Sequence, residues 1–109
     1  MSIAPQSISA IDGFYKVLAK IHEIVSHPDR LKILNAVSAR PRTYSEIASI
    51  INANPRMISW HLSVLKNYGF INKKGKDYMI TDLGRLLIHD TINSMVQVVE
   101  RTLESVRFT

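Results

Sequence analysis

The chain has 109 residues, 46% of them hydrophobic, and its 14 Lys and Arg against 9 Asp and Glu give a net charge of +5. This length fits one domain of about 100 to 200 residues, and so apolar a composition disfavours disorder. The sequence holds no cysteine, no secretory signal and no apolar run of roughly 18 residues, which excludes disulfides and thiolate chemistry and predicts a cytoplasmic protein.

The positive charge is concentrated in the middle of the chain. Residues 40–76 contain seven Lys and Arg and a single acid, Glu46, which gives +6, so the remaining residues sum to −1. Such a block favours a polyanionic partner, although a solvated lysine-rich surface has the same pattern.

Apolar residues at steps of three and four predict two helices in the first part of the chain, over residues 7–25 and 28–40. Pro28 favours the start of the second helix, because a proline at a first helical position loses no hydrogen bond. Thr43 and Glu46 form a capping-box pattern, which predicts that a third helix begins there.

A fourth helix is predicted to begin at Pro55 and to end at Gly69. Ile58, Leu62 and Leu65 recur at the spacing of one helix face. This face is therefore expected to pack inward and to leave the other side of the helix exposed.

The last third of the chain predicts a small hairpin and a long helix. Two short strands, 70–73 and 77–81, flank the three-residue loop 74–76. From Asp82 to Arg107 an apolar seam recurs at steps of mostly four and three, and a helix that long, roughly 39 Å, exceeds what so small a core covers. The expected fold is mostly α with a small β-hairpin, with long N- and C-terminal helices that form a dimer. The predicted dimer interface consists of Ile11, Tyr15, Leu18, Ile88, Ile92, Met95, Val99, Leu103 and Val106.

Two helices joined by a short turn and followed by a basic hairpin are typical of a helix-turn-helix, which places its second helix in the DNA major groove. The outward side of the predicted helix 55–68 suits DNA because it has no acid. Arg56 can pair with guanine or a phosphate, and Ser59 and Ser63 can hydrogen-bond to either. The other candidates are Met57, Trp60, Lys66 and Asn67 on this helix and Lys73, Lys74 and Lys76 at the hairpin, which suit the DNA backbone or minor groove.

Trp60, His61 and the hairpin lysines can each be explained by a purely structural role. Trp60 can instead pack into the helix interface as part of the core, as large aromatic residues often do. His61 lies beside the apolar stripe and is more simply explained as a structural histidine between helices than as a ligand. The hairpin lysines can serve only to keep an exposed loop soluble.

The segments HPDRLKIL (27–34), YSEIA (44–48) and ISWHLSVLKNYGFI (58–71) resemble the winged helix-turn-helix of ArsR-like transcriptional regulators, particularly archaeal ones. The resemblance covers about residues 26–88. It implies a homodimeric repressor in which the fourth helix reads an inverted repeat and the hairpin is the wing. It divides the chain into an N-terminal dimerisation helix (7–25), a DNA-binding core with its wing (26–81) and a C-terminal dimerisation helix (82–107). The residues that it places on the DNA-facing helix are Arg56, Met57, Ser59, Trp60 and Ser63, and it places Tyr44 and Ser45 near a backbone phosphate.

The sequence departs from the metal-sensing members of that family. Many of them bind metal through cysteines on the recognition helix, and this chain has none. A second family site uses acids and histidines of the last helix, where His89, Asp90 and Glu100 are candidates. Leu87 and Leu103 stand where ligands are expected, so we expect no metal and no cofactor.

No enzyme is expected. The four histidines fall on different predicted helices or their ends, and the glycines form neither a phosphate-binding loop nor a dinucleotide fingerprint. The expected function is sequence-specific binding of double-stranded DNA. Two alternatives remain open: a winged-helix protein-interaction module, and a nonspecific chromatin-type DNA binder.

Overall fold

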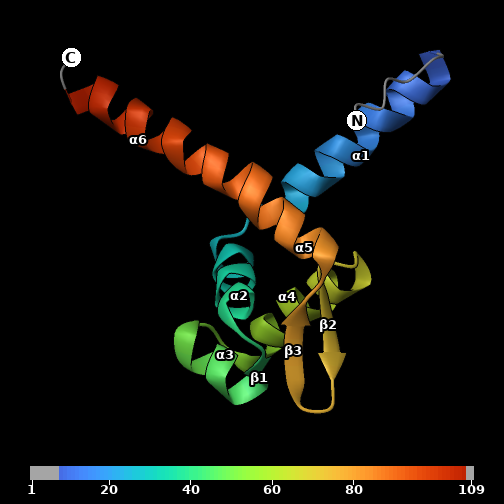
Figure 1. Cartoon of the computed structure of the whole chain (residues 1–109), viewed down its shortest axis with the longest axis vertical. Coiled ribbons are helices and arrows are strands. Elements are labelled where there is room, and N and C mark those ends of the chain that lie inside the picture. The colour runs from blue at the N-terminus through green and yellow to red at the C-terminus, as the bar shows by residue number, and fades with distance from the viewer. Residues whose placement is uncertain (1–7, 108–109) are drawn as a thin grey trace.

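A computed structural model describes residues 8–107, except for the side chains of residues 8–10, 90 and 91. The predicted start of the first helix at Ser7 lies outside this range. The helices are α1 (Ile8–Ile24), α2 (Pro28–Ala39), α3 (Tyr44–Ile50), α4 (Pro55–Asn67), α5 (Asp82–Leu86), the π-helical segment η1 (Leu87–Ile92) and α6 (Asn93–Arg107), and the strands are β1 (Arg42–Thr43), β2 (Ile71–Lys74) and β3 (Asp77–Ile80). The fold is the predicted winged helix, mostly α with a small antiparallel sheet (Figure 1).

The sheet has three strands in the order β1-β3-β2, one more than predicted. β1 consists of two residues and pairs with β3, with Arg42 opposite Tyr78. The hairpin loop also differs from the prediction, because Lys74 pairs with Asp77 and only Gly75 and Lys76 remain between the strands. Gly75 has a φ of 62°, the conformation that a two-residue hairpin loop requires of its first residue.

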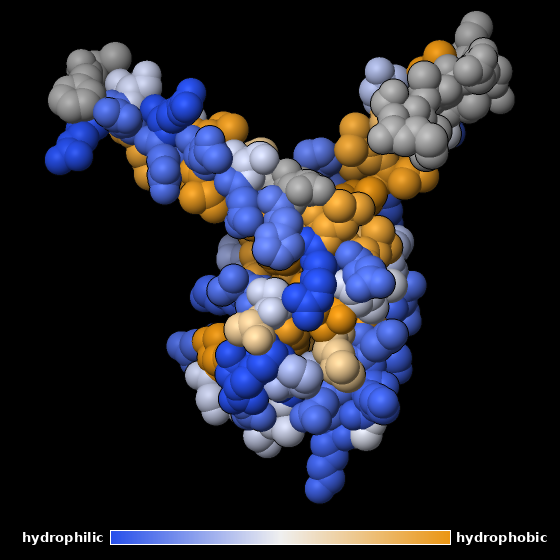
Figure 2. Space-filling view, in the orientation of Figure 1, coloured by the Kyte–Doolittle hydropathy of each residue, from blue (hydrophilic) through white to orange (hydrophobic). Residues whose placement is uncertain are grey.

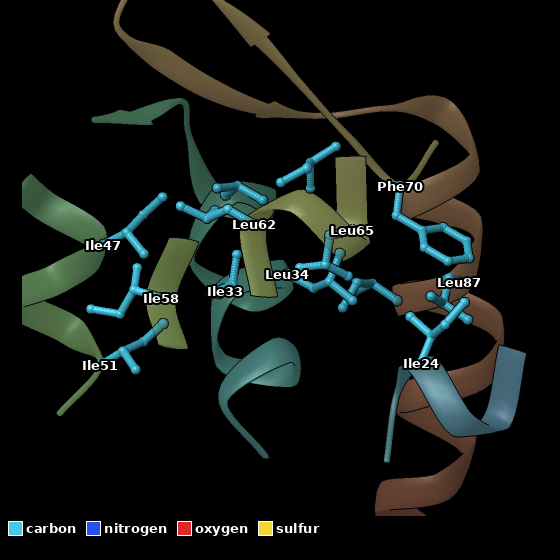
Figure 3. Packing of buried hydrophobic residues seen from close by; sticks show 13 residues of the cluster. Ile24, Ile33, Leu34, Ile47, Ile51, Ile58, Leu62, Leu65, Phe70 and Leu87 are labelled. Atoms are coloured by element: carbon cyan, nitrogen blue, oxygen red, sulfur yellow. The ribbon is translucent and has the colours of Figure 1, made fainter. Parts of the chain in front are cut away.

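The hydrophobic core lies where α2, α3 and α4 meet the sheet and the start of the C-terminal helix (Figure 3). The predicted inward stripe of α4 is confirmed, since Ile58, Leu62 and Leu65 are all buried. Ile24, at the end of α1, also reaches the core and anchors that helix. The other members of the core cluster are Ile33, Leu34, Val37, Ile47, Ile51, Phe70, Ile71, Leu87 and Ile88.

α5, η1 and α6 follow one another in a single long rod, which leaves the body on one side while α1 leaves it on the other (Figure 1). The expected regular helix is therefore interrupted by the wider turns of a π-helix over 87–92. Its seam also starts later than predicted. Ile88 is only 8% exposed and belongs to the core of a single chain, and Ile92 is half-buried against that core.

The remaining residues of the predicted dimer interface are exposed on the two projecting helices, which we call the arms: residues 8–20 of α1 and all of α6. Figure 2 shows apolar residues along both arms and on the upper part of the body where the arms leave it. The exposed predicted residues are Ile11, Tyr15, Leu18, Met95, Val99, Leu103 and Val106. Within residues 8–107, no helix is both long and apolar enough to cross a membrane.

Candidate nucleic-acid interface

Both ends of α4 are fixed by local hydrogen bonds. At the start, the Asn54 side-chain oxygen accepts a hydrogen bond of 2.9 Å from the Met57 N–H. At the end, Gly69 adopts a φ of 80°, and the N–H groups of Gly69 and Phe70 donate to the carbonyls of Lys66 and Leu65. This pair of bonds is a Schellman motif, which glycine favours because it has no Cβ. The helix therefore has a defined length and position.

The outward side of α4 is exposed along its whole length and carries no acid. One edge of the helix is buried against α2 and the sheet, as predicted. The opposite side presents all the candidates that the sequence places there. They are Arg56, Met57, Ser59, Trp60, Ser63, Lys66 and Asn67.

The wing, formed by β2, β3 and the loop 75–76, brings its lysines beside this face. A groove of about 190 Å³ between α4 and the wing is lined by Ser59, Leu62, Ser63, Lys66, Lys73 and Tyr78. A second groove, of about 240 Å³, is lined by Thr43, Tyr44, Ser45, Lys73, Gly75, Lys76 and Tyr78. The structure thus brings together three predicted groups: the serines and Lys66 of α4, Lys73 and Lys76 of the wing, and the start of α3.

Tyr78 is the residue of this region that the sequence analysis missed. It is half-buried on β3 and lines both grooves, and the Lys73 ammonium lies 5.4 Å from the centre of its ring. Its position in a short strand gives no sign of this role in the sequence. Lys74 lines neither groove, and it pairs across the hairpin with Asp77, an acid at the edge of the basic segment.

Two arginines of the basic segment 40–76 bind groups of the protein itself. The capping box of α3 is confirmed, and the carboxylate of Glu46 that completes it also pairs with Arg40 and lies 3.8 Å from Arg42. The hydrogen bond from Arg40, followed by that from the Thr43 N–H, lowers the pKa of Glu46. Arg42 also donates to the Ala36 carbonyl at 3.1 Å. The cations left to face a ligand are Arg56, Lys66, Lys73, Lys74 and Lys76, none of which lies within 4.0 Å of a described carboxylate.

Tyr44 connects α3 to the start of α4. Its hydroxyl donates to the Pro55 carbonyl at 3.3 Å, and the side chain is half-buried, whereas Ser45 next to it is exposed. Tyr44 therefore holds the two helices of the helix-turn-helix together and leaves Ser45 open to a ligand.

Trp60 and His61 behave differently although they are neighbours. His61 is 2% exposed, and its Nδ1 accepts a hydrogen bond of 3.0 Å from Nε of Arg30 on α2, which fits the structural role expected for it. Burial, and then the charge of Arg30, lowers the pKa of His61. Trp60 is 46% exposed, yet its ring stacks on Arg30 and meets His27 edge-on. It therefore packs against Arg30 of α2 and borders the exposed outward side of α4.

Among the described side chains, no three His, Asp or Glu lie close enough together to hold a metal ion. Asp90, one of the candidate ligands, has a side chain outside the described part of the chain.

Comparison with known proteins agrees with this geometry. Residues 27–73 match the model of a family described as bacterial regulatory protein, arsR family. The transcriptional repressor SdpR of Bacillus subtilis is 29% identical over 83 residues, which is 74% of this chain and 91% of the repressor.

Two solved structures share the fold. Rv0081 of M. tuberculosis superposes with a TM-score of 0.68 at 24% identity, over 88% of this chain and 97% of its own. The homodimeric winged helix-turn-helix DNA-binding domain Mb0332 of Mycobacterium bovis, described as a possible ArsR-family regulator, gives a TM-score of 0.62 at 26% identity over 91% of each chain.

The fold, the acid-free face of α4 and the adjoining basic wing define a winged helix-turn-helix, a class of DNA-binding transcriptional regulators. Within that class, the segment 27–73 is similar to regulators of the arsR family.

Proposed function

We propose that the protein is a homodimeric repressor that reads an inverted repeat in double-stranded DNA with α4 and grips the flanking backbone with the wing. The observation that supports this is the continuous acid-free surface formed by the outward side of α4 and the two grooves beside it. A repressor acts by occupying a promoter, and SdpR, the relative described above, is itself a transcriptional repressor.

Each side chain of the surface has a role that follows from its chemistry. Arg56, in the first turn of α4, suits a guanine edge, and Ser59 and Ser63 suit base edges or phosphates. Lys66 and Lys73 line the same groove, and two lysines there suit a phosphate of the DNA backbone. The second groove, with Tyr44, Ser45 and Lys76, suits the neighbouring phosphate.

The dimer is proposed to form through the arms, with residues 26–81 as the DNA-binding core between them. Exposed apolar side chains recur along α1 and α6, and a row of such residues marks an interface. A twofold axis between the arms would direct two α4 helices into successive major grooves about 34 Å apart, so the half-sites are expected one helical turn apart. We place the protein in the cytoplasm. The archaeal subtype stays a prediction, since the relatives named above are bacterial.

Selection of genomic DNA fragments with the purified protein tests the proposal. Enrichment of one motif that contains an inverted repeat is expected. Uniform recovery of fragments would instead indicate a nonspecific chromatin-type binder, and no recovery would favour a protein-interaction module. Either result would overturn the proposed function.

A further inference from the structure

Arg30 is a buried cation that contacts three helices at once. Its side chain is 3% exposed. Its Nε donates to His61 Nδ1 on α4 at 3.0 Å, and its Nη1 donates to the Ile24 carbonyl, at the end of α1, at 3.2 Å. The Cζ atom of its guanidinium lies over the Trp60 ring, 4.7 Å from the ring centre. Arg30 itself belongs to α2, so the side chain connects α1, α2 and α4.

The contacts of this guanidinium are unusual for a buried charge. No carboxylate oxygen of the described residues lies within 4.0 Å of it. Its charge is balanced instead by a carbonyl at the negative end of the α1 dipole, by a histidine lone pair and by the π-face of a tryptophan. Each of these partners is directional, so the three helices have to keep their relative positions for the charge to stay satisfied.

The hydrogen bond to His61 also fixes the protonation state of that histidine. Because Nδ1 accepts from Arg30, the proton of the neutral ring is on Nε2, which lies 3.9 Å from the Asp29 carboxylate. His61 is therefore neutral between the Arg30 guanidinium and the Asp29 carboxylate, and the His27 ring contacts the rings of both Trp60 and His61.

We propose that Arg30 is a positioning residue that transmits the orientation of the α1 arm to the DNA-reading helix. The proposal rests on the proposed function, because α1 is taken to meet the second chain and α4 to read DNA. Two half-sites are read together only if both α4 helices keep a fixed orientation relative to the dimer axis. Beyond Ile24 in the core, α1 packs on the body through Ile21. Arg30 adds a directional polar link from this short contact to α4.

The test compares two substitutions of Arg30 with two controls on the same helix. Arg30→Met removes the charge and both hydrogen bonds, whereas Arg30→Lys keeps the charge but loses the planar fork. Lys32→Met removes an exposed cation of α2, and Val37→Ala destabilises the core without touching the cluster.

The first measurement is the ratio of affinities for the selected duplex and for a scrambled duplex of equal composition. Both Arg30 variants are expected to lower this ratio by about tenfold or more, since a misplaced reading helix loses base contacts but keeps phosphate contacts. Both controls are expected to keep the wild-type ratio at a temperature where all variants are folded. An Arg30→Met ratio equal to that of Val37→Ala would overturn the proposal.

The second measurement needs no DNA. In Arg30→Met, amide hydrogen exchange is expected to become faster both at the last turn of α1 and in α4. The fluorescence emission of Trp60, the one tryptophan of the sequence, is expected to shift because its ring loses the cation beside it. In Val37→Ala the emission should stay unchanged. If the α1 amides exchange as in the wild type, Arg30 does not link the arm to α4. A wild-type protein that selects no motif would refute the proposed function, and the exchange measurement would still decide the link between α1 and α4.

Discussion

The body of the molecule and its two arms differ in whether their apolar side chains are buried. In the body, α2, α3, α4 and the sheet bury a common core, and both ends of α4 are capped. In the arms, residues 11–20 of α1 are all exposed, and α6 has no buried residue. The body can therefore be stable as a single chain, whereas the arms gain packing only from a second one.

Charges on the apolar seam of α6 should give the largest effect. We expect the double substitution Val99→Asp with Leu103→Asp to weaken dimerisation by about a thousandfold or more, because two carboxylates would be buried without partners. Val98→Asp is the matched control, since Val98 is an exposed apolar residue of the same helix outside the seam. Sedimentation should give a species of 12.4 kDa for the double variant and twice that mass for the control. A double variant that stays dimeric would show that the arms do not form the interface.

Substitutions at two glycines, Gly84 in the body and Gly13 in the α1 arm, should change stability in opposite directions. A Cβ at Gly84 would lie 2.2 Å from the Phe70 carbonyl oxygen and 2.7 Å from Cγ1 of Ile80, so α5 could no longer approach the sheet as closely. We expect Gly84→Ala to lower the free energy of unfolding by about 3 kcal/mol. At Gly13, in the arm, nothing lies within 4 Å of the added atom, and Gly13→Ala should stabilise the helix by about 1 kcal/mol. Urea unfolding measures both changes, and equal signs would contradict the distinction between body and arm.

Within the body, α4 and the wing should contribute differently to DNA binding. Arg56→Ala is expected to cost about 1–3 kcal/mol at the selected site and less elsewhere, because it removes a base contact. Lys74→Ala with Lys76→Ala should weaken specific and nonspecific binding alike and reduce the salt slope by about 2, since we propose that these lysines contact phosphates. Titrations at several salt concentrations separate the two patterns. An unchanged specificity ratio in Arg56→Ala would mean that the assigned face of α4 does not read bases.

The smallest predicted effect is that the stability of the body depends on pH. Because the pKa of His61 is lowered by burial and by Arg30, the folded protein binds fewer protons at this site than the unfolded chain, whose histidine titrates near about 6.5. The stability from neutral His61 is therefore present above that pH and is lost as the pH falls below it. Thermal melts from about pH 7.5 to about pH 5.5 should show a falling Tm. Glu46, whose pKa is also lowered, loses its contribution only below its usual value of 4.5.

The control for this effect is His61→Asn, in which an amide oxygen can take the hydrogen bond from Arg30 without titrating. Its Tm should change less between the same pH values. Burial lowers the pKa of His61 most; of the ionisable groups around it, Arg30 and His27 also lower this pKa and Asp29 raises it. Parallel curves for the two proteins would remove His61 as the origin of the pH dependence.

Local signals in the sequence were sufficient for the helices of the body and for the face of α4. Each of these signals acts within a few residues. The structure confirms the helix ends predicted from the capping box at Thr43, the proline after an asparagine at Pro55 and the glycine at Gly69. The spacing of Ile58, Leu62 and Leu65 separated the buried side of α4 from the exposed one for the same reason.

Other features depend on residues far apart in the chain, and the sequence pattern did not contain them. β1 is two residues long and exists because β3 pairs with it. The apolar seam was expected to begin at Ile88. A π-helical segment there changes the number of residues per turn and directs the Ile88 side chain into the core. A prediction from periodicity assumes a constant number of residues per helical turn, so it cannot reveal such an interruption.

The order of the helices and the hairpin, the outward side of α4 and the exposed apolar residues of both arms were predictable from the sequence, because each follows from composition or from contacts within a few turns. Only the tertiary structure brought Lys73 and Tyr78 beside α4 and placed Arg30 against His61, residues that are 31 positions apart. Such contacts depend on how whole helices pack, since burial and the direction of each side chain are decided by neighbours that the local sequence does not specify.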